Sequence, residues 1–332
     1  MSAVYIYEPS HNQSITIAKL FRKYSKENIY GVIYNKNENL NFKNRYYDKF
    51  ISESDVSKDN DGIYIPTNAA STGYFLEKGD IPLGDVCLTK DCLMAFDKVY
   101  LLNKAVKAGV PIPKTWKNIE DIPDNEYPVF YKQDKEATED FNIRGIANRK
   151  EDVPLDVIPD VIFQEYIDSK GTCQVCFIAR DGEILCYFPQ YSGEGFPKVG
   201  GVPVFVEKYD SPKMLDYTRL LLKEIKYSGW GQAEYKYCNK RKDFVFMEIN
   251  AKFWASCDFA FRNNPDFSKL LFNLDTKKEN IKKMVYLDKA MQRGRAFFIK
   301  NIFIILFSKI NYELFTFRKF LFFLFPKLFP LS

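Results

Sequence analysis

The segment GQAEYKYCNKRKDFVFMEINAKFW, which starts at Gly231, constrains the fold more than any other stretch of the chain. AEYKYC and DFVFMEI each alternate side-chain character, which is the pattern of half-buried β-strands. The polar run NKRK joins them, so the segment predicts a β-hairpin. With the turn centred on Arg241, Lys236 lies opposite Phe246.

The same register places two carboxylates face to face. Glu234 lies opposite Glu248, and Asn250 lies two residues beyond Glu248 on the same face. Opposed like charges destabilise a sheet unless a cation lies between them. Magnesium is held by one or two carboxylates and leaves its other positions to water and phosphates. The set therefore predicts a magnesium site; the alternative is a register shifted by one residue, with one glutamate facing solvent.

Composition limits the class of protein. The 332 residues are enough for two domains, and 46% apolar with 27% charged residues is an ordinary globular balance. A net charge of +5 over this length does not indicate a nucleic-acid partner. Seven cysteines and one histidine, His11, without paired metal-ligand spacing suit a reducing cytoplasm and disfavour zinc. The N-terminus lacks the basic and apolar regions of a signal peptide.

The first 90 residues predict a small α/β domain. AVYIYE, IYGVIY and DGIYIPT read as strands, and SITIAKLFRKYSKE reads as a helix between the first two. The first turn, EPSHNQS, lacks the glycines of a dinucleotide fingerprint. We therefore expect a Rossmann-like domain that does not bind a dinucleotide.

A helix followed by strands is predicted next. Residues 93–108 form an amphipathic helix that ends before a glycine and two prolines. Strands are expected over 127–132 and 161–167, then a hairpin turning at Asp181-Gly182, and a helix near 213–226. The apolar face of the first helix comprises Phe96, Val99, Leu102, Ala105 and Val106.

The C-terminal segment differs in composition. Residues 296–332 hold eleven of the thirty phenylalanines, one acid (Glu313) and five basic residues. Their uncharged runs are too short to span a bilayer, which needs about 20 apolar residues. Basic residues among Phe, Leu and Ile predict an interfacial helix on an anionic membrane surface. Helices that pack on the protein itself or in a homodimer are the alternative.

Five segments in a fixed order resemble the ATP-grasp superfamily. They are FDKVYLLNKAVKAGVPIPKTW, YPVFYK, IFQEYIDSKG, GQAEYKYC and FMEINAKFWAS, and they are most similar to its carboxylate–amine ligase-like branch, including members found with surface-polysaccharide genes. The resemblance implies an α/β (α+β) fold with antiparallel sheets. It places a pre-ATP-grasp domain at 1–90, a two-lobed domain at 91–280 (lobes 91–165 and 166–280), and a helical tail at 281–332.

The resemblance also assigns the nucleotide contacts. Lys98 and Lys132 match the family's two phosphate-binding lysines; a buried ammonium at the end of an apolar strand needs an anion. The family's glycine-rich phosphate loop is replaced by QDKEATEDFNIRGIA, in which Lys135 or Arg144 supplies the positive contact.

The segment QEYID matches the hinge between the lobes. The resemblance implies that its backbone binds adenine and that an acid binds the ribose. The positions are Gln164, Glu165, Tyr166, Ile167 and Asp168, and Glu165 and Asp168 both remain candidates for the ribose.

Glu234, Glu248 and Asn250 match the family's magnesium ligands, and Mn²⁺ is an acceptable substitute. Lys252 stands where the family often has arginine, which keeps the charge but loses bidentate recognition. We expect Lys252, Arg262 or Lys198 to bind the substrate carboxylate.

The resemblance implies an ADP-forming carboxylate–amine ligase. The cysteine usage predicts a cytoplasmic protein, and the C-terminal composition predicts a peripheral location at the inner face of the membrane. ATP would activate a small-molecule or saccharide-linked carboxylate as an acyl-phosphate, and an amine would then form an amide. Two alternatives stay open: phosphorylation of a hydroxyl, and a non-catalytic ATP-binding module at a membrane assembly.

Overall fold

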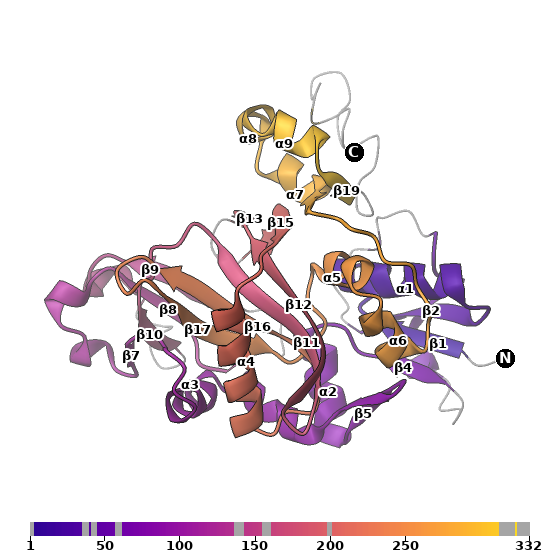
Figure 1. Ribbon diagram of the computed structural model, residues 1–332, viewed down its shortest axis with the longest axis horizontal. Helices are drawn as coiled ribbons and strands as arrows, with labels where there is room; N and C mark the ends of the chain where they lie inside the picture. The colour runs from indigo at the N-terminus through magenta and orange to yellow at the C-terminus, as the bar shows by residue number, and fades with distance from the viewer. Residues whose placement is uncertain are drawn as a thin grey trace.

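The computed structural model contains three larger β-sheets and two short hairpins. It describes residues 3–34, 40, 45–56, 62–135, 143–154, 161–197, 201–311 and 323. The N-terminal sheet lies at one end of the molecule, and the β7–β10 region lies at the other (Figure 1). The longest sheet runs between them.

The N-terminal domain is a parallel sheet in the order β3-β2-β1-β4, which confirms the Rossmann-like expectation. Its first strand, AVYIY, is almost fully buried, because both faces of a parallel sheet are covered. The elements are β1 (Ala3–Tyr7), α1 (Asn12–Tyr24), β2 (Asn28–Ile33), β3 (Lys49–Ser52), β4 (Ile63–Ile65) and α2 (Ala69–Lys78). A small hairpin, β5 (Ile81–Leu83) and β6 (Val86–Leu88), follows.

A four-stranded antiparallel sheet forms the first lobe, in the order β7-β10-β8-β9. Its elements are α3 (Lys98–Lys107), β7 (Thr115–Trp116), β8 (Val129–Gln133), β9 (Arg144–Ala147) and β10 (Val161–Glu165). Asp97 caps α3, since its Oδ1 accepts a hydrogen bond from the Tyr100 amide at 2.8 Å. Val106, expected on the buried face of this helix, is exposed, whereas Leu102 and Ala105 are buried.

A seven-stranded sheet forms the second lobe, in the order β17-β16-β11-β12-β15-β18-β19. The strands in chain order are β11 (Thr172–Arg180), β12 (Glu183–Ser192), β15 (Phe205–Lys208), β16 (Gly229–Cys238), β17 (Asp243–Asn250), β18 (Lys283–Tyr286) and β19 (Lys309–Asn311). The β11–β12 hairpin turns at Asp181 and Gly182, as predicted, and both have positive φ angles (50° and 84°).

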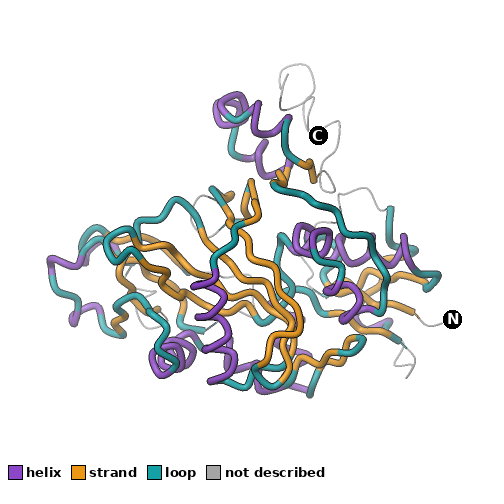
Figure 2. The backbone as a smooth tube through the Cα atoms, viewed as in Figure 1, coloured by secondary structure: helices purple, strands orange, loops and turns teal. Residues whose placement is uncertain are grey.

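Short helices and a second small hairpin complete the fold, and Figure 2 shows the helices in purple and the strands in orange. They are β13 (Gly195–Phe196), β14 (Val202–Pro203), α4 (Pro212–Glu224), α5 (Cys257–Asn263), α6 (Asp266–Phe272), α7 (Leu287–Gln292), α8 (Arg295–Lys300) and α9 (Ile302–Leu306). The 3₁₀ turns are η1 (Glu53–Asp55), η2 (Lys90–Phe96), η3 (Ile119–Asp121), η4 (Asp124–Glu126) and η5 (Lys150–Asp152).

The N-terminal domain and the second lobe share one apolar core. Buried residues from β1, α1, β11, β16 and α5 belong to the same cluster, and the rings of Phe21 and Phe272 lie 5.4 Å apart. The first lobe has a smaller core of its own, built around Val129 and Phe163. The first lobe also joins the large core, through Leu101, Leu102 and Ala105 of α3 and Ile162 of β10.

The C-terminal segment, expected as a helical tail, contributes two strands to the long sheet. β18 pairs antiparallel with β15, and β19 pairs parallel with β18. Ile305 is buried in a small core with Val204, Val285 and Ala290. No helix in the part of the chain that the structure describes is long and apolar enough to cross a membrane.

Candidate active site

A row of polar side chains crosses four strands of the second lobe. Gln190 on β12 faces Gln174 on β11, which faces Glu234 on β16, which faces Glu248 on β17. Directly paired residues of antiparallel strands share a face, so the row lies on one side of the sheet. The predicted opposition of Glu234 and Glu248 is confirmed.

The rest of the hairpin register differs from the prediction. Cys238 pairs with Asp243, so Lys236 faces Val245 and not Phe246. A β-bulge between Glu234 and Tyr235 then inserts Met247 as an extra residue of β17 and restores the Glu234–Glu248 pairing.

The two carboxylates bring negative charge into a buried part of the sheet. Burial raises the pKa of the Glu234 carboxyl to about 7, and the neighbouring charge of Glu248 adds to this. Asn250 donates from Nδ2 to Glu234 Oε1 at 3.0 Å, which leaves its amide oxygen as a further ligand. Two carboxylates and an amide oxygen are the donors that magnesium uses, so these residues fit a bound Mg²⁺.

Lys132 connects the two lobes at this point. Its Nζ, on β8 of the first lobe, lies 3.3 Å from Glu248 Oε2 and donates to the Met247 carbonyl oxygen at 3.3 Å. Burial lowers the pKa of the Lys132 ammonium, and the charge of Glu248 partly opposes this. Burial removes water from the Lys132 ammonium, and a phosphate bound beside it would supply hydrogen-bond acceptors in place of that water.

Other predicted phosphate contacts lie around Lys132. Lys98 is the first residue of α3, is 8% exposed, and its charge acts on Lys132. Arg144 on β9 pairs directly across from Lys132, so the two share a face of the first lobe. Lys135 pairs with Asp97 in an isolated β-bridge. The intervening residues 136–142 lie outside the described part of the chain.

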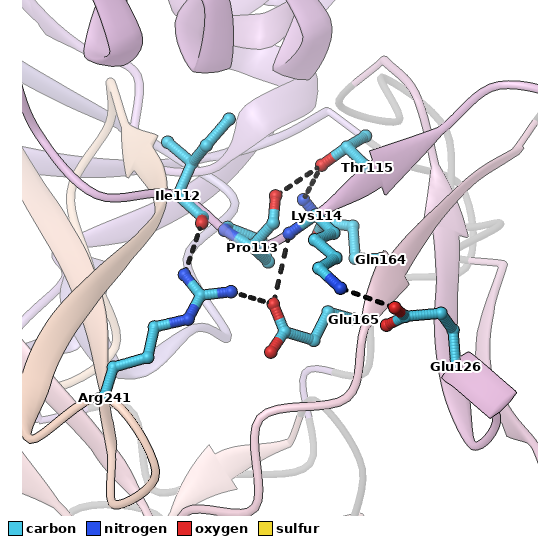
Figure 3. Close-up of polar contacts among 8 residues, drawn as sticks. All are labelled: Ile112, Pro113, Lys114, Thr115, Glu126, Gln164, Glu165 and Arg241. Atoms are coloured by element: carbon cyan, nitrogen blue, oxygen red, sulfur yellow. Dashed lines mark hydrogen bonds and ion pairs between the residues drawn. The ribbon is translucent and has the colours of Figure 1, made fainter.

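The hinge acid Glu165 bonds to protein groups (Figure 3). Its Oε2 accepts from Arg241 Nη2 and from the Lys114 amide, the latter at 3.3 Å. Arg241 Nη1 donates to the Ile112 carbonyl oxygen at 2.9 Å. These contacts connect the end of β10, the 112–114 segment and the β16–β17 turn, so Glu165 acts here as a link between the lobes.

The neighbouring hinge residues have different surroundings. Gln164 is fully buried and donates from Nε2 to Thr115 Oγ1 at 3.3 Å. Ile167 is buried, whereas Asp168 is exposed. Tyr166 lies under the Lys236 ammonium, 5.9 Å from Nζ to the ring centroid. Of the two candidates for the ribose, Asp168 is the one with an exposed side chain.

The link at Glu165 makes a prediction about stability. We expect Glu165→Gln and Arg241→Gln each to lower the free energy of unfolding by about 1 kcal/mol, because each breaks the same partly buried, charge-assisted pair. The free energy of unfolding of the double variant should fall by no more than that of the less stable single variant. Chemical denaturation of the four proteins checks this; additive losses would contradict a shared role.

The three residues expected to bind the substrate carboxylate have different surroundings. Lys252 is half-buried and its positive charge lowers the pKa of Glu234, so it lies near the residues predicted to bind magnesium. Arg262 donates to Asp258 at 2.8 Å and to Glu279 at 3.1 Å, so its guanidinium is engaged by two carboxylates of the protein itself. Lys198 lies outside the described residues.

Several residues of the site were not singled out from the sequence. Gln190 Nε2 donates to Gln174 Oε1 (2.8 Å) and to Ser256 Oγ (2.7 Å), and Ser192 Oγ donates to Gln174 Oε1 (2.7 Å). Gln174 Nε2 lies 3.5 Å from Glu234 Oε1. Gln174 interrupts a largely buried, apolar stretch of β11, which is a weak signal in the sequence. Gln190 and Ser192 lie on β12, which alternates buried and exposed residues, so their place in the row follows from the strand pairing.

Solved structures similar to this chain belong to carboxylating and ligating enzymes. Biotin carboxylase of Campylobacter jejuni is 14% identical (TM-score 0.59) and aligns over 85% of this chain and 74% of its own. L-amino acid ligase of Bacillus licheniformis is 9% identical (TM-score 0.56) and aligns over 82% and 73%.

The chain spans a much smaller part of a third similar structure. Pyruvate carboxylase of Rhizobium etli is 11% identical (TM-score 0.60) over 80% of this chain but only 27% of its own. No protein-family model matches the chain, and no curated protein matches its sequence. At these identities the similarity establishes the fold.

Proposed function

We propose that this chain, which has the ATP-grasp fold, is an ADP-forming ligase that activates a carboxylate and joins it to an amine. The observation that carries the proposal is the buried Lys132 of one lobe in contact with Glu248 of the other, opposite Glu234. A phosphate chain between the lobes would meet both the ammonium and a metal held by the carboxylates.

Each group of the site has a defined task. Glu234, Glu248 and Asn250 would hold Mg²⁺, or Mn²⁺ in its place, which when bound neutralises phosphate charge. Lys98 and Lys132 hold the phosphates, with Lys135 and Arg144 at the edge of the first lobe. Backbone groups of Gln164, Glu165, Tyr166 and Ile167 bind adenine, and Asp168 binds the ribose.

The reaction needs no side-chain nucleophile, because the substrate carboxylate itself attacks ATP. The protein positions the two substrates and offsets the negative charge of the reacting groups. An oxygen of the substrate carboxylate attacks the γ-phosphorus, the bond to the bridging oxygen breaks, and ADP leaves. The nitrogen of the amine attacks the acyl carbon and inorganic phosphate leaves, while the proton of the amine passes to solvent. Lys252 lies where it can hold the acceptor carboxylate and offset its charge.

The neighbours support this class of reaction. The Campylobacter jejuni enzyme was solved as a complex with β-γ-ATP, and the Bacillus licheniformis enzyme is an amino acid ligase. We further propose that the carboxylate is carried by a saccharide or lipid-linked precursor at the cytoplasmic face of a membrane. The basic, phenylalanine-rich C-terminal segment supports this location.

Hydroxylamine trapping tests the proposal. Incubation with MgATP, pooled carboxylic acids and hydroxylamine should give acid-dependent ADP release and a hydroxamate, because hydroxylamine attacks an acyl-phosphate in place of the amine. The variant Lys132→Met should lose at least about 100-fold in ADP release, since it removes a buried charge beside the phosphates.

The other outcomes separate the alternatives. ADP with a stable phosphorylated product and no hydroxamate would indicate phosphorylation of a hydroxyl. Binding of MgATP without ADP release for any acid would indicate a non-catalytic binding module.

A further inference from the structure

The helices α8 and α9 expose several large apolar side chains. Ile299, Phe303, Leu306 and Phe307 are 69%, 73%, 64% and 88% exposed. Phe303 and Leu306 lie three residues apart on α9, so they share one side of that helix, and Phe307 follows its last residue. Ile299 lies on the preceding α8. We refer to these four residues as the α8–α9 stripe.

The opposite side of the same helices is packed against the protein. Ile305 is buried with Val204, Val285 and Ala290, and Phe297 and Phe298 pack against this cluster. The helices are therefore fixed to the sheet by one apolar face while a second apolar face points outward. Soluble proteins rarely expose such a patch unless it binds something.

Charge identifies the kind of surface that fits. Residues 294–311 contain Arg295, Lys300 and Lys309 and no acid. Lys309 pairs with Glu279 at 3.3 Å, and Arg295 Nε donates to the Phe323 carbonyl oxygen at 2.6 Å. Residues 312–332 add Arg318, Lys319 and Lys327 against the single Glu313. An apolar stripe flanked by basic residues matches the interface of a bilayer with anionic lipids.

The position of the stripe suits contact with a flat surface. In Figures 1 and 2, α8 and α9 project from the body of the molecule. The preceding α7 contacts β13, and Arg293 forms an ion pair with Glu194, which precedes that strand. Docking through the stripe would bring the β13–β14 hairpin close to the bilayer.

We propose that the α8–α9 stripe docks the protein on an anionic lipid bilayer by inserting its four apolar side chains, with Lys300 next to the headgroups. Docking does not require the nucleotide site, so its failure and the failure of the ligase proposal are distinguishable. Truncation near Gly294 is a poor test, because it removes β19 and the buried Ile305.

Vesicle sedimentation of the full chain tests the proposal. The double variant Phe303→Ser, Phe307→Ser is compared with the control Val106→Ser, Leu220→Ser, which changes two exposed apolar residues of α3 and α4. Wild type should bind vesicles of phosphatidylcholine and phosphatidylglycerol (about 70:30) at least about 10-fold more tightly than phosphatidylcholine alone. The affinity of the stripe variant for the anionic vesicles should fall by at least about 10-fold, and the affinity of the control variant should not change.

Further measurements keep the result unambiguous. Lys300→Glu should weaken binding to anionic vesicles and leave folding unchanged, since it is an exposed residue. Equal binding by wild type and the stripe variant, or no binding by wild type, would overturn the proposal. Light scattering that shows a dimer broken by the stripe substitutions, without vesicle binding, would assign the face to a second copy of the chain and also overturn it.

Discussion

Replacing Glu248 with glutamine should abolish magnesium-dependent nucleotide binding. Glutamine keeps the size of the side chain and an oxygen that can face Lys132, but it removes the negative charge that the metal needs. We expect the affinity for MgATP to fall by at least about 100-fold, since even residues that only support metal ligands cost 10–100-fold. Calorimetric titration of wild type and variant measures this.

The same titration without magnesium separates the metal site from the fold. With a chelator present, ATP should bind the Glu248→Gln protein at least as well as wild type, because one negative charge beside the phosphates is gone. Glu207→Gln is the matched control: Glu207 lies on the same sheet and pairs with Lys283 at 2.7 Å. Equal MgATP affinity in wild type and Glu248→Gln would exclude Glu248 as a metal ligand.

The hairpin that carries these acids shows what local pattern predicts. Alternation identified both strands and placed Glu234 opposite Glu248. The turn, however, shifts the pairing by one residue, so that Lys236 faces Val245 and not Phe246. The bulge at Met247 reverses this shift, so that Glu234 still faces Glu248. A bulge is a local insertion in the pairing that leaves the apolar pattern almost unchanged, so the sequence does not reveal it.

Long-range contacts account for the other differences. Glu165 meets Arg241 across 76 positions of the chain, and that ion pair exists only because the lobes fold together. The three residues of β19 lie within a stretch rich in phenylalanine, leucine and isoleucine, and their pairing with β18 depends on the sheet edge already being formed. Neither contact has a local signature.

Order along the chain was more informative than any one motif. The parallel N-terminal sheet, the two antiparallel sheets and the clustering of Lys132 with Glu234 and Glu248 follow the predicted sequence of segments. The neutral row of Gln174, Gln190 and Ser192 required the strand pairing, because each residue alone is an ordinary polar interruption.

Replacing Glu234 with glutamine should make the metal-free protein more stable above pH 7. Burial and the charge of Glu248 raise the pKa of Glu234 to about 7, well above the ordinary value for glutamate. The folded state therefore holds a proton that the unfolded state releases, and wild type loses stability as pH rises through 7. Glutamine removes this loss, which we put at about 2 kcal/mol after allowing for partial exposure.

Thermal melts with chelator check both the size and the sign. Above pH 7 the variant should melt about 3 °C higher than wild type, whereas near pH 4, where Glu234 is protonated in the folded protein, the two should coincide. Added Mg²⁺ should raise the melting temperature of wild type and not of Glu234→Gln, because only wild type offers the second carboxylate. A variant that is less stable than wild type above pH 7 would mean that the opposed carboxylates stabilise the metal-free fold. In that case the two acids would not be a site held ready for a cation, and the strongest reason for placing magnesium between them would be gone.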